Sequence, residues 1–160
     1  MAIYLEYEGI KGNVTADGYK EHIAVDSVSF SVMRGITMEA GNMTNRESTR
    51  PSLSEVNLSK SADSSATAIF KEAVTGKAGK KVKIKFVRTG ADKVEEFMVY
   101  ALEDTLVSGY SMDASSEGEP HESISLSYSK IEITYSDFDK GNKSGNPLRG
   151  GYDLELAKPL

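Results

Sequence analysis

The sequence predicts a single all-β domain spanning residues 1–160, built from two packed sheets in a barrel-like arrangement with one amphipathic helix. Three observations predict this class. Most of the chain alternates between apolar and polar residues with a period of two, which is typical of half-buried strands. Only one segment carries the helical period. The chain has 160 residues, a length at which one domain can bury its own core without disulfides.

The strand predictions rest on this alternation and on the places where it slips. Residues 81–86 alternate lysine with a hydrophobe throughout, which indicates a strand with one solvated face. The parity of the apolar positions changes between Val25 and Val28 and again between Tyr128 and Ile131, which predicts a bulge or bend in each strand. Residues 97–102 are almost continuously apolar, as expected of a strand covered on both faces. Weaker patterns predict strands at 3–10, 53–58 and 152–156 and a hairpin turn at 88–93.

The predicted helix covers residues 64–75. Its apolar residues recur three and four apart on one face: Ala66, Ile69, Phe70, Ala73 and Val74. Asp63 and the serines after it offer N-cap side chains, and Gly76 is a suitable residue for the C-terminal end. We expect the apolar stripe, Phe70 included, to be buried against the sheets.

Three segments show neither period and are predicted as loops: 34–52, 113–122 and 137–151. Loops longer than ~15 residues are unusual in a compact domain and are often functional. The long extended loop Arg34–Ser52 combines adaptable methionines with arginines suited to acidic partners. We expect it to contact a neighbouring assembly unit through Met38, Met43, Arg46 and Arg50.

Composition excludes several kinds of site. The net charge of −5 disfavours nucleic acid as a partner, and the absence of cysteine removes thiolate metal sites and thiol nucleophiles. With two histidines the chain has few imidazole ligands for a metal centre, and none of its serines lies in a Gly-x-Ser-x-Gly nucleophile elbow. We therefore expect no enzyme, no catalytic or metal site and no cofactor.

The sequence also carries no targeting signal. Two carboxylates interrupt the apolar stretch at residues 1–8, and no uncharged apolar run approaches the ~20 residues that span a bilayer. We expect a protein that is made in the cytoplasm without stable membrane insertion. If it leaves the cell, it does so through a machine that does not read signal peptides.

Charge is distributed unevenly along the chain. Cations concentrate between residues 71 and 88, whereas acids gather between 95 and 122. One interpretation is a solvated strand face. The other is a protomer with basic and acidic sides that meet head to tail in a ring, with Lys83 and Lys85 at the subunit interface.

A second candidate surface follows from strand alternation around residue 29. Val28, Phe30 and Val32 share one parity and are predicted to face the core. The residues of opposite parity are predicted to face outward: Ser27, Ser29 and Ser31.

The order and spacing of several short motifs resemble the haemolysin-coregulated protein (Hcp) family, the tube protein of type VI secretion. The motifs span most of the chain: Glu8–Gly12, Ile23–Val25, Val28–Phe30, Asn57–Lys60, Asp63–Ser65, Thr75–Lys77, Leu106–Ser108, Glu122–Tyr128 and Ile133–Tyr135. The resemblance implies hexameric rings that stack into a tube, which a contractile sheath expels behind a spike and which is itself secreted. It also implies a lumen that holds and protects effector proteins, and the family pattern of a small polar residue between two large ones falls on Ser29.

Two other classes of function fit the residues less well. A monomeric β-barrel carrier of a small ligand would need an apolar interior cavity, whereas the inward positions are mostly bulky. A hydrolase would need a nucleophile or metal constellation, which the sequence does not offer. Native mass separates a ring from a monomeric carrier.

Overall fold

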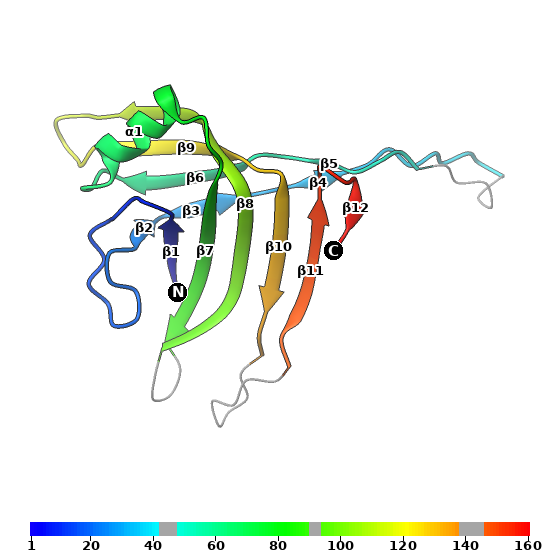
Figure 1. Ribbon diagram of the computed structural model, residues 1–160, viewed down its shortest axis with the longest axis horizontal. Coiled ribbons are helices and arrows are strands. Elements are labelled where there is room, and N and C mark those ends of the chain that lie inside the picture. The colour runs from blue at the N-terminus through cyan, green and yellow to red at the C-terminus, as the bar shows by residue number, and fades with distance from the viewer. Residues whose placement is uncertain (42–47, 90–93, 138–145) are drawn as a thin grey trace.

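The computed structural model describes residues 1–41, 48–89, 94–137 and 146–160, which form a β-rich fold with one helix (Figure 1). The helix is α1 (Ala66–Thr75). In chain order the strands are β1 (Ala2–Tyr7), β2 (Ile23–Val25), β3 (Ser27–Ser29), β4 (Val32–Met33), β5 (Ser52–Leu53), β6 (Val56–Ser61), β7 (Lys80–Thr89), β8 (Val94–Asp113), β9 (His121–Ser127), β10 (Lys130–Tyr135), β11 (Leu148–Asp153) and β12 (Lys158–Pro159).

The strands form two sheets that share β8. The first sheet runs β12-β11-β10-β8-β7-β1-β2, and the second runs β3-β6-β9-β8. Figure 1 shows the strands of the second sheet crossing those of the first at a steep angle. The predicted all-β class with two packed sheets is confirmed, although the strand ladder does not close into a continuous barrel.

The chain passes between the sheets at one bent strand and at two breaks between strands. The long strand β8 pairs with β7 and β10 through its first half and with β9 through its second half. Asp104, with φ 53°, marks the corner between the two halves. The parity slip predicted near Tyr128 is the break between β9 and β10, and the slip after Val25 is the break between β2 and β3. Both slips therefore mark the passage of the chain from one sheet to the other.

The hydrophobic core lies between the two sheets and under α1. Its fully buried aliphatic side chains come from both sheets and the helix: Leu5, Ile23, Val56, Leu58, Ile69, Val82, Ile84, Leu102, Ile124, Leu126 and Ile131. Burying a side chain of this size contributes about 1.5–3 kcal/mol relative to leaving it in water. This core fixes which face of each strand turns inward.

The helix packs on a different face from the one its hydropathy predicts. Ile69 is 2% exposed, but Phe70 is 54% exposed and Val74 is 65% exposed, so the expected burial of Phe70 is wrong. The face toward the sheets carries small and polar residues at helical spacing: Ser65, Ala68, Ile69 and Glu72. Ser65 is fully buried and bonds to Asp63, whereas Ala68 and Glu72 are only partly buried, so a count of apolar residues does not identify the face that the sheets cover.

The predicted long loop is in part a two-stranded arm. Strands β4 and β5 pair, and an isolated bridge joins Ile36 to Ser48. The Thr49 N–H donates to the Gly35 carbonyl at 2.9 Å, which continues the ladder, and the Gly35 N–H donates to Thr49 Oγ1 at 2.8 Å. Figure 1 shows this arm reaching away from the body of the molecule. Val32 lies on the arm and is exposed, so the prediction that it faces the core is wrong.

Residues 97–102 lie within β8 as predicted, but Leu102 alone among them is buried, so the expected covering of both faces is not found in this chain. Other predicted elements differ in their ends. Residues 148–151, predicted as loop, begin β11 and pair with β10, because a Gly-Gly pair hides the strand pattern. Arg88 and Thr89 lie in β7, and residues 90–93 of the predicted turn are outside the described ranges. No helix in the described parts of the chain is long and apolar enough to cross a membrane.

Candidate functional site: a serine-rich sheet face

The outer face of the second sheet is lined by hydroxyl and amide side chains. On β6 and β9 the inward positions, such as Leu58 and Ile124, are buried in the core. Because strand side chains alternate, the intervening residues must project to the opposite face. Those residues are small and uncharged: Asn57, Ser59, Ser123 and Ser125.

The strand register brings these side chains into two rows across the sheet. One row follows the partners Ser29, Asn57, Ser125 and Gly109. The next row follows the partners Ser27, Ser59, Ser123 and Ser111. We call these eight positions the serine face. Four strands contribute to it, and none of its members carries a charge.

Hydrogen bonds within the serine face hold its side chains in place. The Ser27 and Ser59 hydroxyls bond to each other at 2.5 Å. Ser125 Oγ donates to Asn57 Oδ1 at 2.8 Å. Ser29 is exposed and forms no side-chain hydrogen bond among the described residues. The serine face is therefore a polar surface of small side chains, and its remaining hydrogen-bond donors and acceptors can bind water or a partner.

The three serines predicted to face outward are exposed, as alternation requires, but they do not stay together. Ser27 and Ser29 lie in β3 within the serine face. Ser31 lies past the end of β3, where its N–H donates to Ser54 Oγ at 2.9 Å at the base of the arm. The structure adds five side chains that sequence reasoning missed: Asn57, Ser59, Ser111, Ser123 and Ser125. Their alternation is visible in the sequence, whereas the register that aligns them is not.

A buried polar cluster lies on the core side of the same sheet. Lys60 and Glu122 are both fully buried, and Lys60 Nζ donates to Glu122 Oε1 at 2.6 Å. Lys60 Nζ also donates to Asp63 Oδ1 at 3.1 Å and to the Ser61 carbonyl at 2.9 Å. Tyr110 OH donates to Glu122 Oε2 at 2.5 Å, and burial together with this carboxylate raises the pKa of Tyr110 to about 12.

This cluster also anchors the start of α1. Asp63 Oδ1 accepts the backbone N–H of Ser65 at 2.9 Å and its hydroxyl as well. Asp63 therefore satisfies donors at the helix N-terminus while it shares Lys60 with Glu122. The cluster ties α1 to the second sheet by charge-assisted hydrogen bonds at one defined position.

The arm residues and the β7 lysines occupy separate surfaces. Met38 and Arg50 are exposed on the arm, and Met43 and Arg46 lie outside the described residues. Lys83 is exposed on β7, opposite Glu6 on β1.

Lys85 is engaged within its own protomer. Its Nζ lies 2.7 Å from Glu6 Oε2 and 3.1 Å from His22 Nε2, and over the ring of Tyr19. This ion pair lowers the pKa of Glu6, chiefly through the hydrogen bond from Lys85. Of the two lysines, Lys83 is thus the one left free to meet a neighbouring chain.

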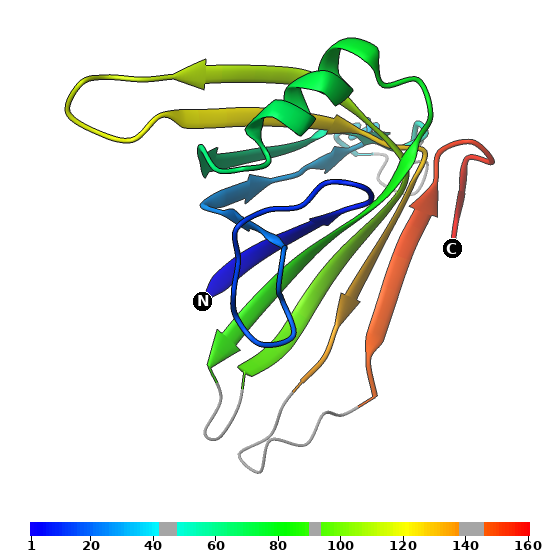
Figure 2. The same ribbon diagram turned by 60° about the vertical axis from the view of Figure 1, so that its left-hand side comes forward.

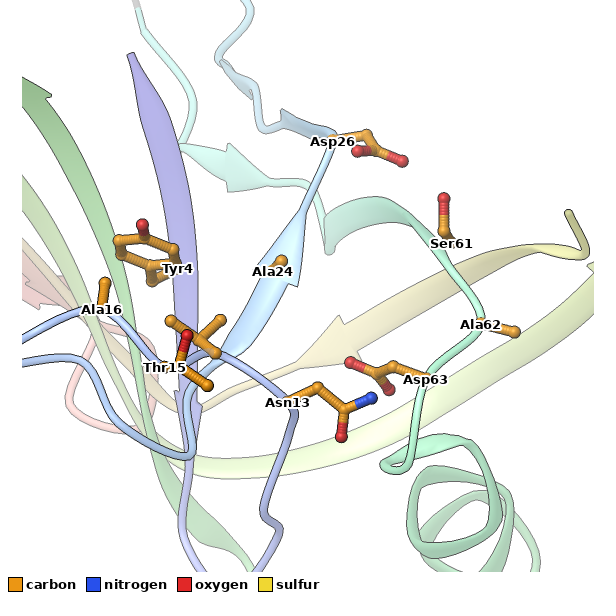
Figure 3. Close-up of a pocket in the computed structure, with 10 residues that line it drawn as sticks. Tyr4, Asn13, Thr15, Ala16, Ala24, Asp26, Ser61, Ala62 and Asp63 are labelled. Atoms are coloured by element: carbon orange, nitrogen blue, oxygen red, sulfur yellow. The ribbon is translucent and has the colours of Figure 1, made fainter.

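The hollows of the described structure are surface features. One of about 470 Å³ lies between the segment 13–16, β2 and the turn before α1, and polar side chains such as Asn13, Asp26 and Asp63 surround it (Figure 3). Bulky side chains fill the space between the sheets. No group of three or more acidic or histidine side chains suited to a metal occurs among the described residues. An apolar hollow of about 170 Å³ lies at the surface near the base of the arm, lined by residues such as Phe30, Leu53 and Ile133.

The chain is similar to proteins of type VI secretion. The family described as "Type VI secretion system effector, Hcp" matches residues 4–135. A solved structure of a type six secretion system protein is 22% identical, with 99% of each chain covered and a TM-score of 0.91. Hcp1 from Salmonella typhimurium is 21% identical over 99% of this chain and 98% of that one, with a TM-score of 0.78. A type VI secretion system effector from Yersinia pestis is 20% identical, with 94% and 98% covered and a TM-score of 0.72. No curated protein sequence matches the chain.

Proposed function

This chain belongs to the Hcp family of type VI secretion system effectors, and from that premise we propose that it is a structural tube subunit and not an enzyme. Six copies form a ring, rings stack into a tube, and a contractile sheath expels the tube behind a spike. The protein is made in the cytoplasm and leaves the cell with the tube. Effector proteins travel in the lumen.

The observation that carries this proposal is the serine face. A lumen that holds varied proteins must bind each of them weakly and remain wettable. Two rows of small neutral residues across four strands, six of them serines, supply such a surface, because they offer hydrogen bonds without bulk or charge. In the proposed ring the serine face lines the lumen, with Ser29 among the residues that contact cargo.

Ring closure is supported by the two ends of the second sheet. Among the described residues, β3 pairs only with β6 and residues 106–113 of β8 pair only with β9, so each end of this sheet presents an edge that no other described strand covers. Unpaired edges invite pairing with another chain, and a head-to-tail contact between different edges generates a ring when the rotation closes. We propose that exposed Lys83 adds an electrostatic contact with an acidic neighbour.

The arm is proposed to join rings along the tube. It reaches away from the body and exposes Met38 and Arg50, which suit an adaptable contact with another protein surface (Figure 1). Deleting residues 38–48 should spare the hexamer but reduce stacking and secretion. Loss of the hexamer in this deletion would place the arm contact within the ring.

The proposed lumen is tested by replacing Ser29 with Gln, which narrows the bore without touching the core. Ser29→Gln should reduce co-purification of an effector encoded with the same secretion system, while native ring mass and melting temperature stay unchanged. Ser116→Gln, at an exposed turn outside the serine face, is the matched control and should retain the effector. Equal retention by both variants would remove Ser29 from cargo binding.

A further inference from the structure

The outward face of α1 is an apolar surface that this protomer leaves uncovered. Phe70 and Val74, one turn apart, are 54% and 65% exposed. The Phe70 ring meets the Tyr110 ring edge to face, with 6.2 Å between their centroids. Beside them is a hollow of about 380 Å³ lined by Ala66, Thr67, Phe70, Lys71 and Tyr110. We call Phe70, Val74, Lys71 and Tyr110 the helix patch.

The charge on the helix patch has one sign. The charged residues within α1 are Lys71 and Glu72. Lys71 lines the hollow and forms no ion pair among the described residues. Glu72 is turned the other way: its carboxylate acts on the buried Tyr7, whose pKa is raised to about 12 by burial and then by Glu72. Lys77 follows the helix after Gly76 and is exposed.

The helix patch and the serine face lie on opposite sides of the second sheet. Tyr110 directs its hydroxyl to buried Glu122 on the core side of β8 and β9, and α1 packs on that side. Figure 2 shows α1 lying along the β8–β9 hairpin. A partner on α1 and a partner on the serine face would therefore not compete for space.

We propose that the helix patch binds an acidic amphipathic helix of a partner protein. An apolar side chain of that helix would fill the hollow beside Phe70, and its carboxylates would pair with Lys71 and Lys77. The apolar contact supplies affinity, whereas the cations select an acidic partner over a basic one. This binding does not depend on the proposed lumen, because the helix patch is complete in a single chain.

The experiment measures binding of model peptides to the full chain by fluorescence anisotropy. The probe is a labelled helical peptide of about 18 residues, or ~5 turns, with leucines on one face and glutamates elsewhere. A second peptide replaces every glutamate with lysine. The glutamate peptide should bind at least about tenfold more tightly than the lysine peptide, and added salt should reduce the difference.

Variants then place the binding on α1. Phe70→Ser and Val74→Ser should each weaken the glutamate peptide about tenfold or more, and Lys71→Glu should do so mainly at low salt. Val74→Ser should leave the fold intact because Val74 lies outside the core, so weaker binding in this variant reports on the helix patch and not on misfolding. Leu156→Ser and Lys20→Glu, which change an exposed apolar residue and an exposed cation elsewhere, are the matched controls.

Three results would overturn the inference. The first is no binding of the glutamate peptide, or equal binding of both peptides. The second is unchanged binding in the α1 variants. The third is a change of native mass in Phe70→Ser or Val74→Ser, which would show that the helix patch joins copies of this chain instead. None of these results depends on whether Ser29 contacts cargo.

Discussion

Replacing Lys60 with Met removes the cation at the centre of the buried polar cluster. Lys60 and Glu122 are both fully buried, and their side chains are 2.6 Å apart. Without Lys60, Glu122 keeps a single hydrogen bond, from Tyr110, and its charge stays in the core. An uncompensated buried charge of this kind costs about 3–5 kcal/mol.

This loss is large against the roughly 5–15 kcal/mol that stabilises a typical domain. At about 2–4 °C per kcal/mol for a chain of this size, the melting temperature should fall by on the order of 10 °C. Urea unfolding followed by circular dichroism gives the free energy directly. The cluster also anchors α1, so the Lys60→Met protein should lose helical signal early in the transition.

The double variant Lys60→Met with Glu122→Met is the control for the charge argument. Removing both ions from the core should cost much less than the sum of the two single losses, since a buried pair is often replaceable by apolar side chains. Some cost should remain, because Tyr110 OH and Asp63 each lose a partner. A loss below about 1 kcal/mol in Lys60→Met, or additive losses in the double variant, would refute the reasoning.

Three further predictions follow from packing, charge and titration. Ile69→Ala should cost about 2–5 kcal/mol because Ile69 is buried, whereas Phe70→Ala should cost well under half of that, and equal urea midpoints would contradict the packing. Lys83→Glu should weaken ring assembly at low salt, whereas an unchanged ring mass would remove the electrostatic contact but not the ring. Burial raises the pKa of four tyrosines above their ordinary value near 10: Tyr7, Tyr19, Tyr110 and Tyr128. Because folding favours their protonated form, the stability they contribute is complete below pH 10 and is lost as the pH rises toward 12. A melting temperature constant from pH 9 to 12 would contradict this.

The sequence was most informative where a buried sheet face imposed a period of two. The alternation along residues 81–86 predicted β7, and the parity slips after Val25 and Tyr128 predicted both corners. It failed for β11, whose Gly-Gly pair carries no side-chain pattern, and for the packing face of α1, where Ile69 is buried but Phe70 and Val74 are exposed. Hydropathy cannot decide which side of a helix the sheets cover when apolar residues lie on both sides.

The candidate site was predictable only in part for a related reason. Alternation alone places Ser27 and Ser29 outward, but the two rows of the serine face depend on register between strands far apart in sequence. The sequence does carry a signal for the buried polar cluster. Lys60 shares the parity of Leu58, and Glu122 shares the parity of Ile124, so a buried opposite-charge pair could have been suspected from the pattern.

The native mass of the purified full-length chain tests the central claim most directly. Native mass spectrometry at moderate ionic strength should show a species of six protomers, each of 17.4 kDa. Negative-stain images of the same sample should show rings with an open centre. A monomer at every accessible concentration would contradict the account, because the serine face would then line no lumen.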